Sequence, residues 1–179
     1  MEASVVSDTA ARLARTPPTL FAWLDGLPAE AWREDEGPGT WSPFQVLCHL
    51  LHAEDDDWIP RIRIVLQPVS PRRFTPFDRE AGFLTYGHHE PRALLDLFSS
   101  KRQANLDALA EFKIAPAALS RTATHPELGE VTLAQLLACW LTHDAAHIAQ
   151  IARLLVRYHG AGIGPWRPFF RALRSEPTE

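Results

Sequence analysis

The sequence predicts an all-α protein, a four-helix bundle with a long crossover between its second and third helices and a short C-terminal helix. Three observations lead to this fold class. Four long segments place apolar residues at helical spacing, two of them begin with a capping box, and the stretches between them are rich in proline, glycine and charge. No segment alternates convincingly with the period of a strand. A globin-like or repeat-helix arrangement is the less favoured alternative.

The first helix is expected over residues 5–26, with an interruption at the sequence TPP. Thr16 can cap a helix, and Pro17 suits a first helical position, where the missing N–H of proline removes no helical hydrogen bond. We therefore expect a kink or a break inside this helix.

A capping box marks the start of the second helix, which is expected over residues 42–67. Ser42 is the candidate N-cap, Pro43 occupies the first helical position, and Gln45 lies three residues after the cap. The helix is expected to end before Pro68, because a proline disfavours helical conformation in the residue that precedes it.

Residues 68–90 form the long crossover, and two further helices follow it. Loops of this length are often functional lids or crossovers. The third helix is expected over residues 91–112, where leucine and phenylalanine recur at helical spacing. The fourth is expected over residues 132–158, from a second capping box between Thr132 and Gln135 to the sequence HGAGIGP. A short C-terminal helix is expected around the sequence WRPFFRAL.

Length and composition favour one folded domain that covers residues 1–179. The chain has 46% hydrophobic and 22% charged residues, which is typical of globular proteins. Its net charge of -4 argues against nucleic acid as a partner, because lysine and arginine are not clustered. The first residues lack the apolar region of a signal peptide, and no segment has about 18 uninterrupted apolar residues. We expect a cytoplasmic location and no membrane partner.

Two histidines, His143 and His147, lie four residues apart in the sequence LTHDAAHIAQI, on the apolar side of the fourth expected helix. Residues at this spacing are neighbours on one helix face, about 5–6 Å apart at Cβ, so both rings can bind one metal ion. Two neutral histidines with hydrogen bonds to backbone or carboxylate groups are the alternative, and HxxxH alone does not exclude it. A third ligand nearby would favour the metal.

Other histidines supply candidates for that third ligand. They are His49 and His52 in the second helix, His88 and His89 in the crossover, and His125. The second and fourth helices of a bundle can face each other across its interior, which favours His49 and His52. Helical periodicity prefers His52, because His49 lies farther from the apolar stripe of this helix, toward a polar edge. Periodicity alone leaves the choice open.

The sequences WSPFQVLCHLLHAEDDDWIPRIR and HPELGEVTLAQLLACWLTHDAAHIAQIARL, with the later GPW, resemble the DinB-like superfamily in its DinB/YfiT branch. The resemblance covers nearly the whole chain, and the WS…H and HDxxH motifs in this order are far more specific than HxxxH alone. It implies a four-helix bundle whose three histidines bind a divalent metal at one end, often in a homodimer. The matching ligands are His49, eight residues after Trp41, and the pair His143 and His147, which places His52 outside the ligand set.

The resemblance implies the fold and the metal more firmly than the chemistry. Members of the superfamily include transferases and isomerases that use bacterial low-molecular-weight thiols, and some relatives are described as metal-dependent hydrolases. Three imidazoles leave a coordination position for water or a thiol, and they suit Zn²⁺, Ni²⁺ or Fe²⁺. We expect a metal-dependent thiol S-transferase or hydrolase that acts on a small molecule. A non-catalytic metal-binding or stress-associated module with a structural metal is the alternative, and the sequence identifies no catalytic residue.

Four other side chains have roles that the sequence leaves open. Cys48 and Cys139 are expected to be reduced and buried, because two cysteines do not make a disulfide framework in a chain of this size. Glu54 falls on the interior side of the second helix, where a lone carboxylate needs a cation or a donor. It can pair with Arg102, which interrupts the apolar stripe of the third helix, or it can orient a metal ligand.

Tryptophan content bears on packing and on assembly. The chain has six tryptophans, of which Trp41, Trp58, Trp140 and Trp166 are expected to anchor the core. One small core does not readily absorb six such side chains, so the composition adds to the expectation of a homodimer that the resemblance implies.

Overall fold

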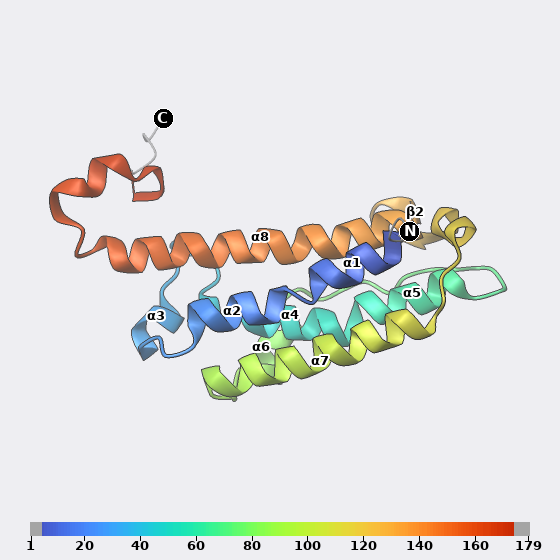
Figure 1. The fold of residues 1–179 in the computed structure, drawn as a ribbon, viewed down its shortest axis with the longest axis horizontal. Coiled ribbons are helices and arrows are strands. Elements are labelled where there is room, and N and C mark those ends of the chain that lie inside the picture. Colours follow the sequence, from blue (N-terminus) through green and yellow to red (C-terminus); the bar gives the residue numbers. More distant parts are fainter. Residues whose placement is uncertain (1–4, 174–179) are drawn as a thin grey trace.

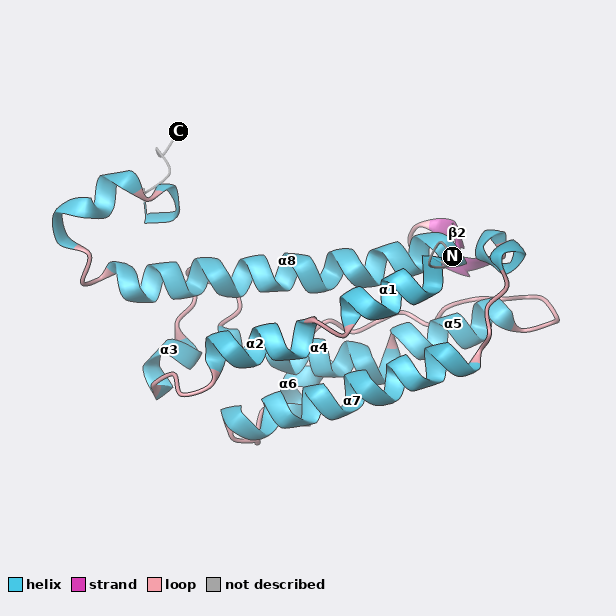
Figure 2. Cartoon of the chain, viewed as in Figure 1, coloured by secondary structure: helices cyan, strands magenta, loops and turns pink. Residues whose placement is uncertain are grey.

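The computed structural model of the chain describes residues 5–173 and shows a four-helix bundle (Figures 1 and 2). Each of its four arms is one long helix or two consecutive shorter ones. The arms are α1 (Val5–Leu13) with α2 (Thr16–Leu24), α4 (Pro43–Asp56) with α5 (Trp58–Leu66), α7 (Pro91–Glu111), and α8 (Leu133–Gly160). In Figure 1 the first and fourth arms run in one direction and the second and third in the other. Two consecutive parallel arms need a long connection, which the crossover supplies. The predicted fold class is confirmed.

Both predicted capping boxes are formed. Ser42 Oγ accepts the N–H of Gln45 at 3.4 Å, and Gln45 Oε1 accepts the N–H of Ser42 at 3.1 Å. Thr132 and Gln135 make the same reciprocal pair at 3.1 and 2.8 Å at the start of α8. Each box satisfies backbone donors that have no partner within the helix. The first residues of α4 and α8 are therefore determined by local chemistry.

The first arm is broken at the sequence TPP, as expected, and α2 begins at Thr16. Pro17 has no N–H to donate to the carbonyl of Leu13, four residues before it. Arg102 of α7 supplies a donor instead, because its Nη1 donates to Leu13 O at 2.9 Å. The break thus provides a main-chain acceptor for a buried arginine.

The second arm is also broken, which the sequence analysis did not predict. Pro60 cannot donate to the carbonyl of Asp56, and its ring crowds that carbonyl. The long helix expected over residues 42–67 is therefore divided, with α4 ending at Asp56 and α5 beginning at Trp58.

Short elements lie between the arms. The first loop contains α3 (Ala29–Arg33), and the crossover contains α6 (Ala81–Tyr86). A hairpin of β1 (Thr122–His125) and β2 (Gly129–Thr132) precedes α8. The sequence did not predict these strands, because four residues are too few to show the alternation of polar and apolar residues that marks a strand. The crossover is tied to this hairpin by main-chain hydrogen bonds from Phe74 N to Thr124 O at 3.0 Å and from Thr124 N to Arg72 O at 2.8 Å.

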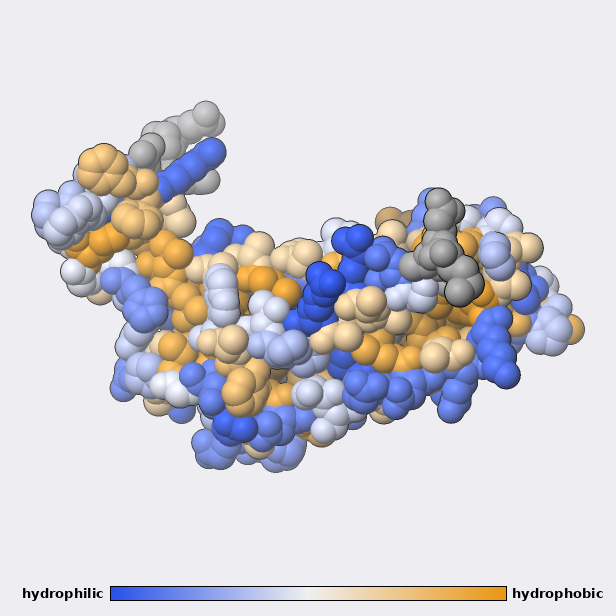
Figure 3. Space-filling view, in the orientation of Figure 1, coloured by the Kyte–Doolittle hydropathy of each residue, from blue (hydrophilic) through white to orange (hydrophobic). Residues whose placement is uncertain are grey.

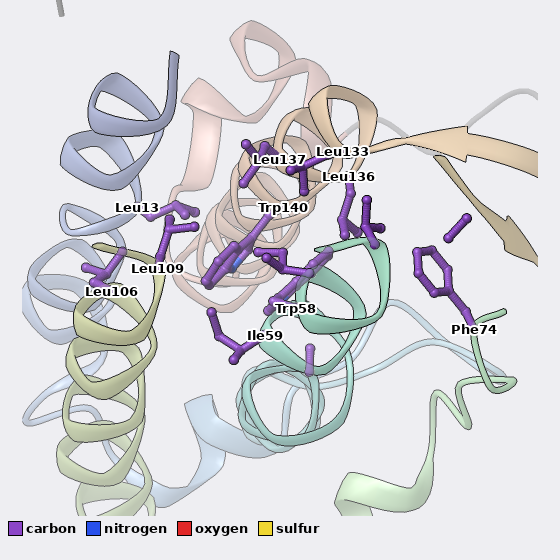
Figure 4. Close-up of a cluster of buried hydrophobic side chains, with 14 residues drawn as sticks. Leu13, Trp58, Ile59, Phe74, Leu106, Leu109, Leu133, Leu136, Leu137 and Trp140 are labelled. Carbon is purple, nitrogen blue, oxygen red and sulfur yellow. The ribbon is translucent and has the colours of Figure 1, made fainter. Parts of the chain in front are cut away.

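Two apolar clusters fill the bundle, and Arg102 contacts both. One cluster surrounds the stacked rings of Trp58 and Trp140, whose centroids are 5.4 Å apart (Figure 4). The other includes Phe98 and joins residues of α2, α4 and α7. The Arg102 guanidinium lies 5.0 Å from the ring of Phe98 and 5.2 Å from the ring of Trp140. Trp58 and Trp140 are the core anchors that the sequence predicts.

Carboxylates and a hydroxyl from the other three arms surround Arg102. Its Nη2 donates to Glu54 Oε1 at 2.8 Å, and its Nη1 donates to Asp144 Oδ2 at 2.5 Å. Thr16 Oγ1 donates to the same oxygen of Asp144 at 2.5 Å. Asn105 Nδ2 donates to Glu54 Oε2 at 2.9 Å. Of the two roles considered for Glu54, the structure shows the ion pair with Arg102.

The end of the chain and one cysteine differ from expectation. The short C-terminal helix is present as two 3-10 segments, η2 (Gly164–Phe169) and η3 (Arg171–Leu173), which project beyond the bundle (Figures 1 and 3). Trp166 in this segment is 64% exposed, so the prediction that it anchors the core is wrong. Cys139 is also exposed, not buried, because it lies about 100° around α8 from the buried Trp140. Cys48 is buried and free, as predicted.

Length and hydropathy decide whether a helix can cross a membrane. Among residues 5–173, every helix is too short or too polar to cross a membrane.

Removal of the Arg102 guanidinium is expected to lower the free energy of unfolding by about 3–5 kcal/mol, because Glu54 and Asp144 would remain buried without their cation. Urea denaturation of Arg102→Met measures this loss. The exposed Arg63 on α5 provides the control, and Arg63→Met is expected to stay within about 0.5 kcal/mol of wild type. Similar small losses in both variants would contradict the role given to Arg102.

Candidate metal centre

Three histidines from two arms of the bundle come together in the interior. His49 of α4 and His143 and His147 of α8 each offer one ring nitrogen, and these atoms all lie within 4.8 Å of one another. His49 Nε2 and His143 Nε2 are 2.9 Å apart. Imidazole nitrogens bound tetrahedrally to Zn²⁺ at about 2.0–2.1 Å are about 3.3 Å apart, so this pair needs to move by only a few tenths of an ångström. Within residues 5–173 no other cluster of this kind occurs.

Hydrogen bonds at the far nitrogens orient two of the rings. His49 Nδ1 lies 2.9 Å from the main-chain oxygen of Arg79, in the crossover. His147 Nδ1 lies 3.0 Å from Gln150 Oε1, one turn further along α8. When Nδ1 donates to these oxygens, Nε2 is the unprotonated nitrogen. Both rings then present a lone pair to the centre of the cluster.

His143 has an incomplete set of partners. Its Nδ1 is buried and has no hydrogen-bond partner among the described residues. Its Nε2 meets another imidazole nitrogen, that of His49. Trp58 lies against the ring in a T-shaped arrangement, with centroids 5.1 Å apart. Buried polar rings normally have better partners than these, so the residues present fit a metal ion.

Burial keeps the three rings neutral. The pKa of His49 is lowered to about 4 and that of His143 to about 2, chiefly by desolvation, and for His143 also by the neighbouring imidazoles and Arg102. Desolvation also lowers the pKa of His147. A metal ion binds the neutral imidazole, and these rings are therefore in the metal-binding form at neutral pH.

Aromatic side chains surround the cluster. The Trp41 ring lies 4.8 Å from the His49 ring and 6.3 Å from the His147 ring, nearly parallel to the latter. Phe77 of the crossover meets His49 edge to face at 5.8 Å. A methyl group at Gly82 would lie 2.4 Å from the carbonyl oxygen of Cys48, so α6 packs directly on the backbone of α4. The crossover is thereby held over the histidines.

The other histidine candidates lie outside the cluster. His52 Nδ1 is 3.2 Å from Asp56 Oδ2, and its ring stacks on Phe77 at 4.8 Å. The rings of His88 and His89 contact each other after α6 at a tilt of 32°, and His125 Nδ1 accepts main-chain N–H groups in the hairpin turn. His49 itself is 3% exposed and faces His143 of α8, so the structure brings into the cluster the histidine that periodicity placed farther from the apolar stripe. That the three clustered histidines bind a metal stays a prediction.

Two residues of the site were not found from sequence. Arg79 and Gln150 support the rings through a carbonyl oxygen and an amide oxygen. Every residue has a main-chain carbonyl, so the sequence does not indicate that the carbonyl of Arg79 supports His49. Gln150 did show a signal, because it lies three residues after His147 on the same face of the helix.

Comparisons with known proteins agree with this geometry. A family model described as the DinB superfamily matches residues 12–151, a range that includes all three histidines. Among solved structures, the chain is similar to YfiT from Bacillus subtilis, described as a probable metal-dependent hydrolase with an unusual four-helix bundle topology. The TM-score is 0.71, the sequences are 19% identical, and 87% of each chain is covered. At this identity the likeness shows the fold alone. No curated protein matches the chain significantly.

Without metal, the protein is expected to lose stability as the pH falls from about 6.5 toward 4. Histidines of the unfolded chain take up protons near their ordinary pKa of about 6.5, whereas the folded site resists protonation, so the unfolded state binds more protons. The loss is at most about 1.4 kcal/mol per pH unit for each imidazole. Urea denaturation of EDTA-treated protein at several pH values measures it. His143→Asn should lose stability less steeply, and equal slopes would contradict the prediction.

Proposed function

The chain belongs to the DinB superfamily, and from this premise we propose that it is a metal-dependent enzyme acting on a small molecule. The proposed ligands are His49, His143 and His147, which bind one divalent transition metal. The observation that supports this most is the convergence of three neutral imidazoles, from buried His49 and His147 and half-buried His143, two of them oriented by a hydrogen bond at the other ring nitrogen. Zn²⁺, Ni²⁺ and Fe²⁺ all suit such donors.

Hydrolysis is the reaction that we propose. A metal held by three imidazoles keeps one position open and supplies a Lewis acid and an activated water at neutral pH. The chain's own residues prepare the site for this chemistry. The Arg79 carbonyl and Gln150 keep two rings in one tautomer, while the rings of Trp41 and Phe77 pack against His49. The fold is shared with YfiT, which is described as a probable metal-dependent hydrolase.

Transfer of a low-molecular-weight thiol is the second candidate. Among the described residues no carboxylate belongs to the histidine cluster, and a thiol on a metal is deprotonated without a general base. The thiol would come from outside the protein. Cys48 is buried, and burial raises the pKa of its thiol to about 11, so it is a poor nucleophile.

A purely structural metal is less well supported. Structural zinc sites have four protein ligands, whereas this cluster has three. The bundle also has other sources of stability, namely two apolar clusters and the ion pairs of Arg102. The homodimer and the cytoplasmic location expected from the sequence stay predictions.

Each of the three ligands is expected to be required for metal binding. Replacing His49, His143 or His147 with Ala should reduce the zinc content of the purified protein sharply, because each change removes one of three protein ligands. His52→Ala is the matched control on the same helix. It should retain zinc with at most the about 10–100-fold loss of affinity typical of an outer-shell residue. Elemental analysis of the four variants measures this, and full retention by His49→Ala would refute the ligand set.

Metal-dependent turnover is the expected result for the loaded protein. Zinc-loaded wild type should hydrolyse 4-nitrophenyl acetate at least about tenfold faster than the EDTA-treated protein, with His143→Ala as the inactive control. A parallel assay supplies cysteine and 1-chloro-2,4-dinitrobenzene and follows the thioether product. Activity only in the second assay would replace hydrolysis with thiol transfer. A lack of metal-dependent rate in both assays would refute the proposed enzyme.

A further inference from the structure

Arg79 lies in the crossover, directly beside the three histidines. Its guanidinium carbon is 5.2 Å from the centre of the Trp41 ring, and that ring contacts the rings of His49 and His147. One aromatic ring therefore connects the guanidinium with two of the three clustered histidines.

The donors of this guanidinium are unused. The side chain is exposed, and among residues 5–173 it has no ion pair and no hydrogen bond. The adjacent acid Asp78 instead accepts the main-chain N–H of Glu80 at 2.9 Å. Arg12, Arg92 and Arg153 are also exposed, and each pairs with a carboxylate. What distinguishes Arg79 among residues 5–173 is that its free N–H groups belong to a guanidinium stacked on Trp41, a ring that contacts two of the three clustered histidines.

Stacking on Trp41 gives this arginine a defined place. A guanidinium over an aromatic ring keeps its in-plane N–H groups free for a ligand. Those N–H groups form a planar fork that matches the two oxygens of a carboxylate or a phosphate. The same Trp41 ring lies 4.8 Å from the His49 ring and 6.3 Å from the His147 ring, so the fork is held on a side chain that borders the histidine cluster.

We propose that Arg79 binds an oxyanion of the substrate, a carboxylate or a phosphate group, beside the three-histidine site. This inference rests on the proposed function, and it specifies the substrate as a small molecule with an anionic group near its reacting bond. Arg79 is a binding residue in this role, since it holds the substrate while the chemistry occurs at the histidines.

Isothermal titration of zinc-loaded and EDTA-treated protein with three matched probes tests the proposal. Succinate presents a second carboxylate, 3-phosphonopropionate presents a phosphonate in its place, and succinamate presents a neutral amide. Arg79→Gln should weaken binding of the first two about 10–100-fold, in line with the loss of charged hydrogen bonds, and weaken binding of succinamate, which has one carboxylate fewer, by less. Arg73→Gln removes an exposed arginine from the same crossover and should change each dissociation constant less than about twofold.

The outcomes separate the anion site from the proposed enzyme. Wild type that binds succinamate as tightly as succinate, or shows no binding of either anion at millimolar concentration, would overturn the role of Arg79. Equal affinities in wild type and Arg79→Gln would also overturn it. Zinc content is measured on the same samples. A protein that binds anions through Arg79 but shows no turnover, or no zinc, retains the anion site and loses the proposed function. The two anions compared in wild type show whether carboxylate or phosphate is preferred.

Discussion

The buried guanidinium of Arg102 is the interaction on which the rest of this bundle depends. It is 1% exposed, and its partners come from each of the other three arms: the Leu13 carbonyl, Glu54 and Asp144. A buried charge without partners would cost several kcal/mol, so arrangements that separate these groups are strongly disfavoured. Asp144 is the residue next to His143. The rotation of α8 that brings Asp144 to Arg102 therefore also turns His143 and His147 toward α4.

Proline in the first arm contributes to this network in a way that helix propensity does not suggest. A regular helix would occupy the Leu13 carbonyl with its own hydrogen bond, and Arg102 Nη1 would lose an acceptor. The break also places Thr16 at the start of α2, where its hydroxyl reaches Asp144 at 2.5 Å. The break at the sequence TPP thus supplies two polar groups, the Leu13 carbonyl and the Thr16 hydroxyl, to the buried ion pairs of Arg102.

Local chemistry made the main elements predictable, whereas contacts between distant segments did not. Capping boxes and helical spacing located α4, α7 and α8, and the HxxxH spacing identified the pair on α8. The choice of His49 over His52 needed the resemblance to a family, because periodicity does not tell which polar edge faces another helix. Arg79 and the hairpin lie in segments without periodicity. Cys139 lies on an exposed part of α8, and Trp166 lies exposed in the segment after α8. Which parts of a helix or tail are covered depends on tertiary packing and does not follow from the local sequence.

Residue 79 joins two tasks that use different atoms. Its main-chain oxygen receives the Nδ1–H of His49, and every amino acid has this oxygen, whereas the guanidinium that stacks on Trp41 belongs to the side chain. A codon change at this position can therefore replace the outer group while the ring of His49 keeps its support. Duplicated genes with this architecture could diverge in the molecules they accept by single substitutions, without an intermediate in which the histidine cluster is lost. The division of labour between backbone and side chain makes this part of the crossover a place where new specificities can evolve.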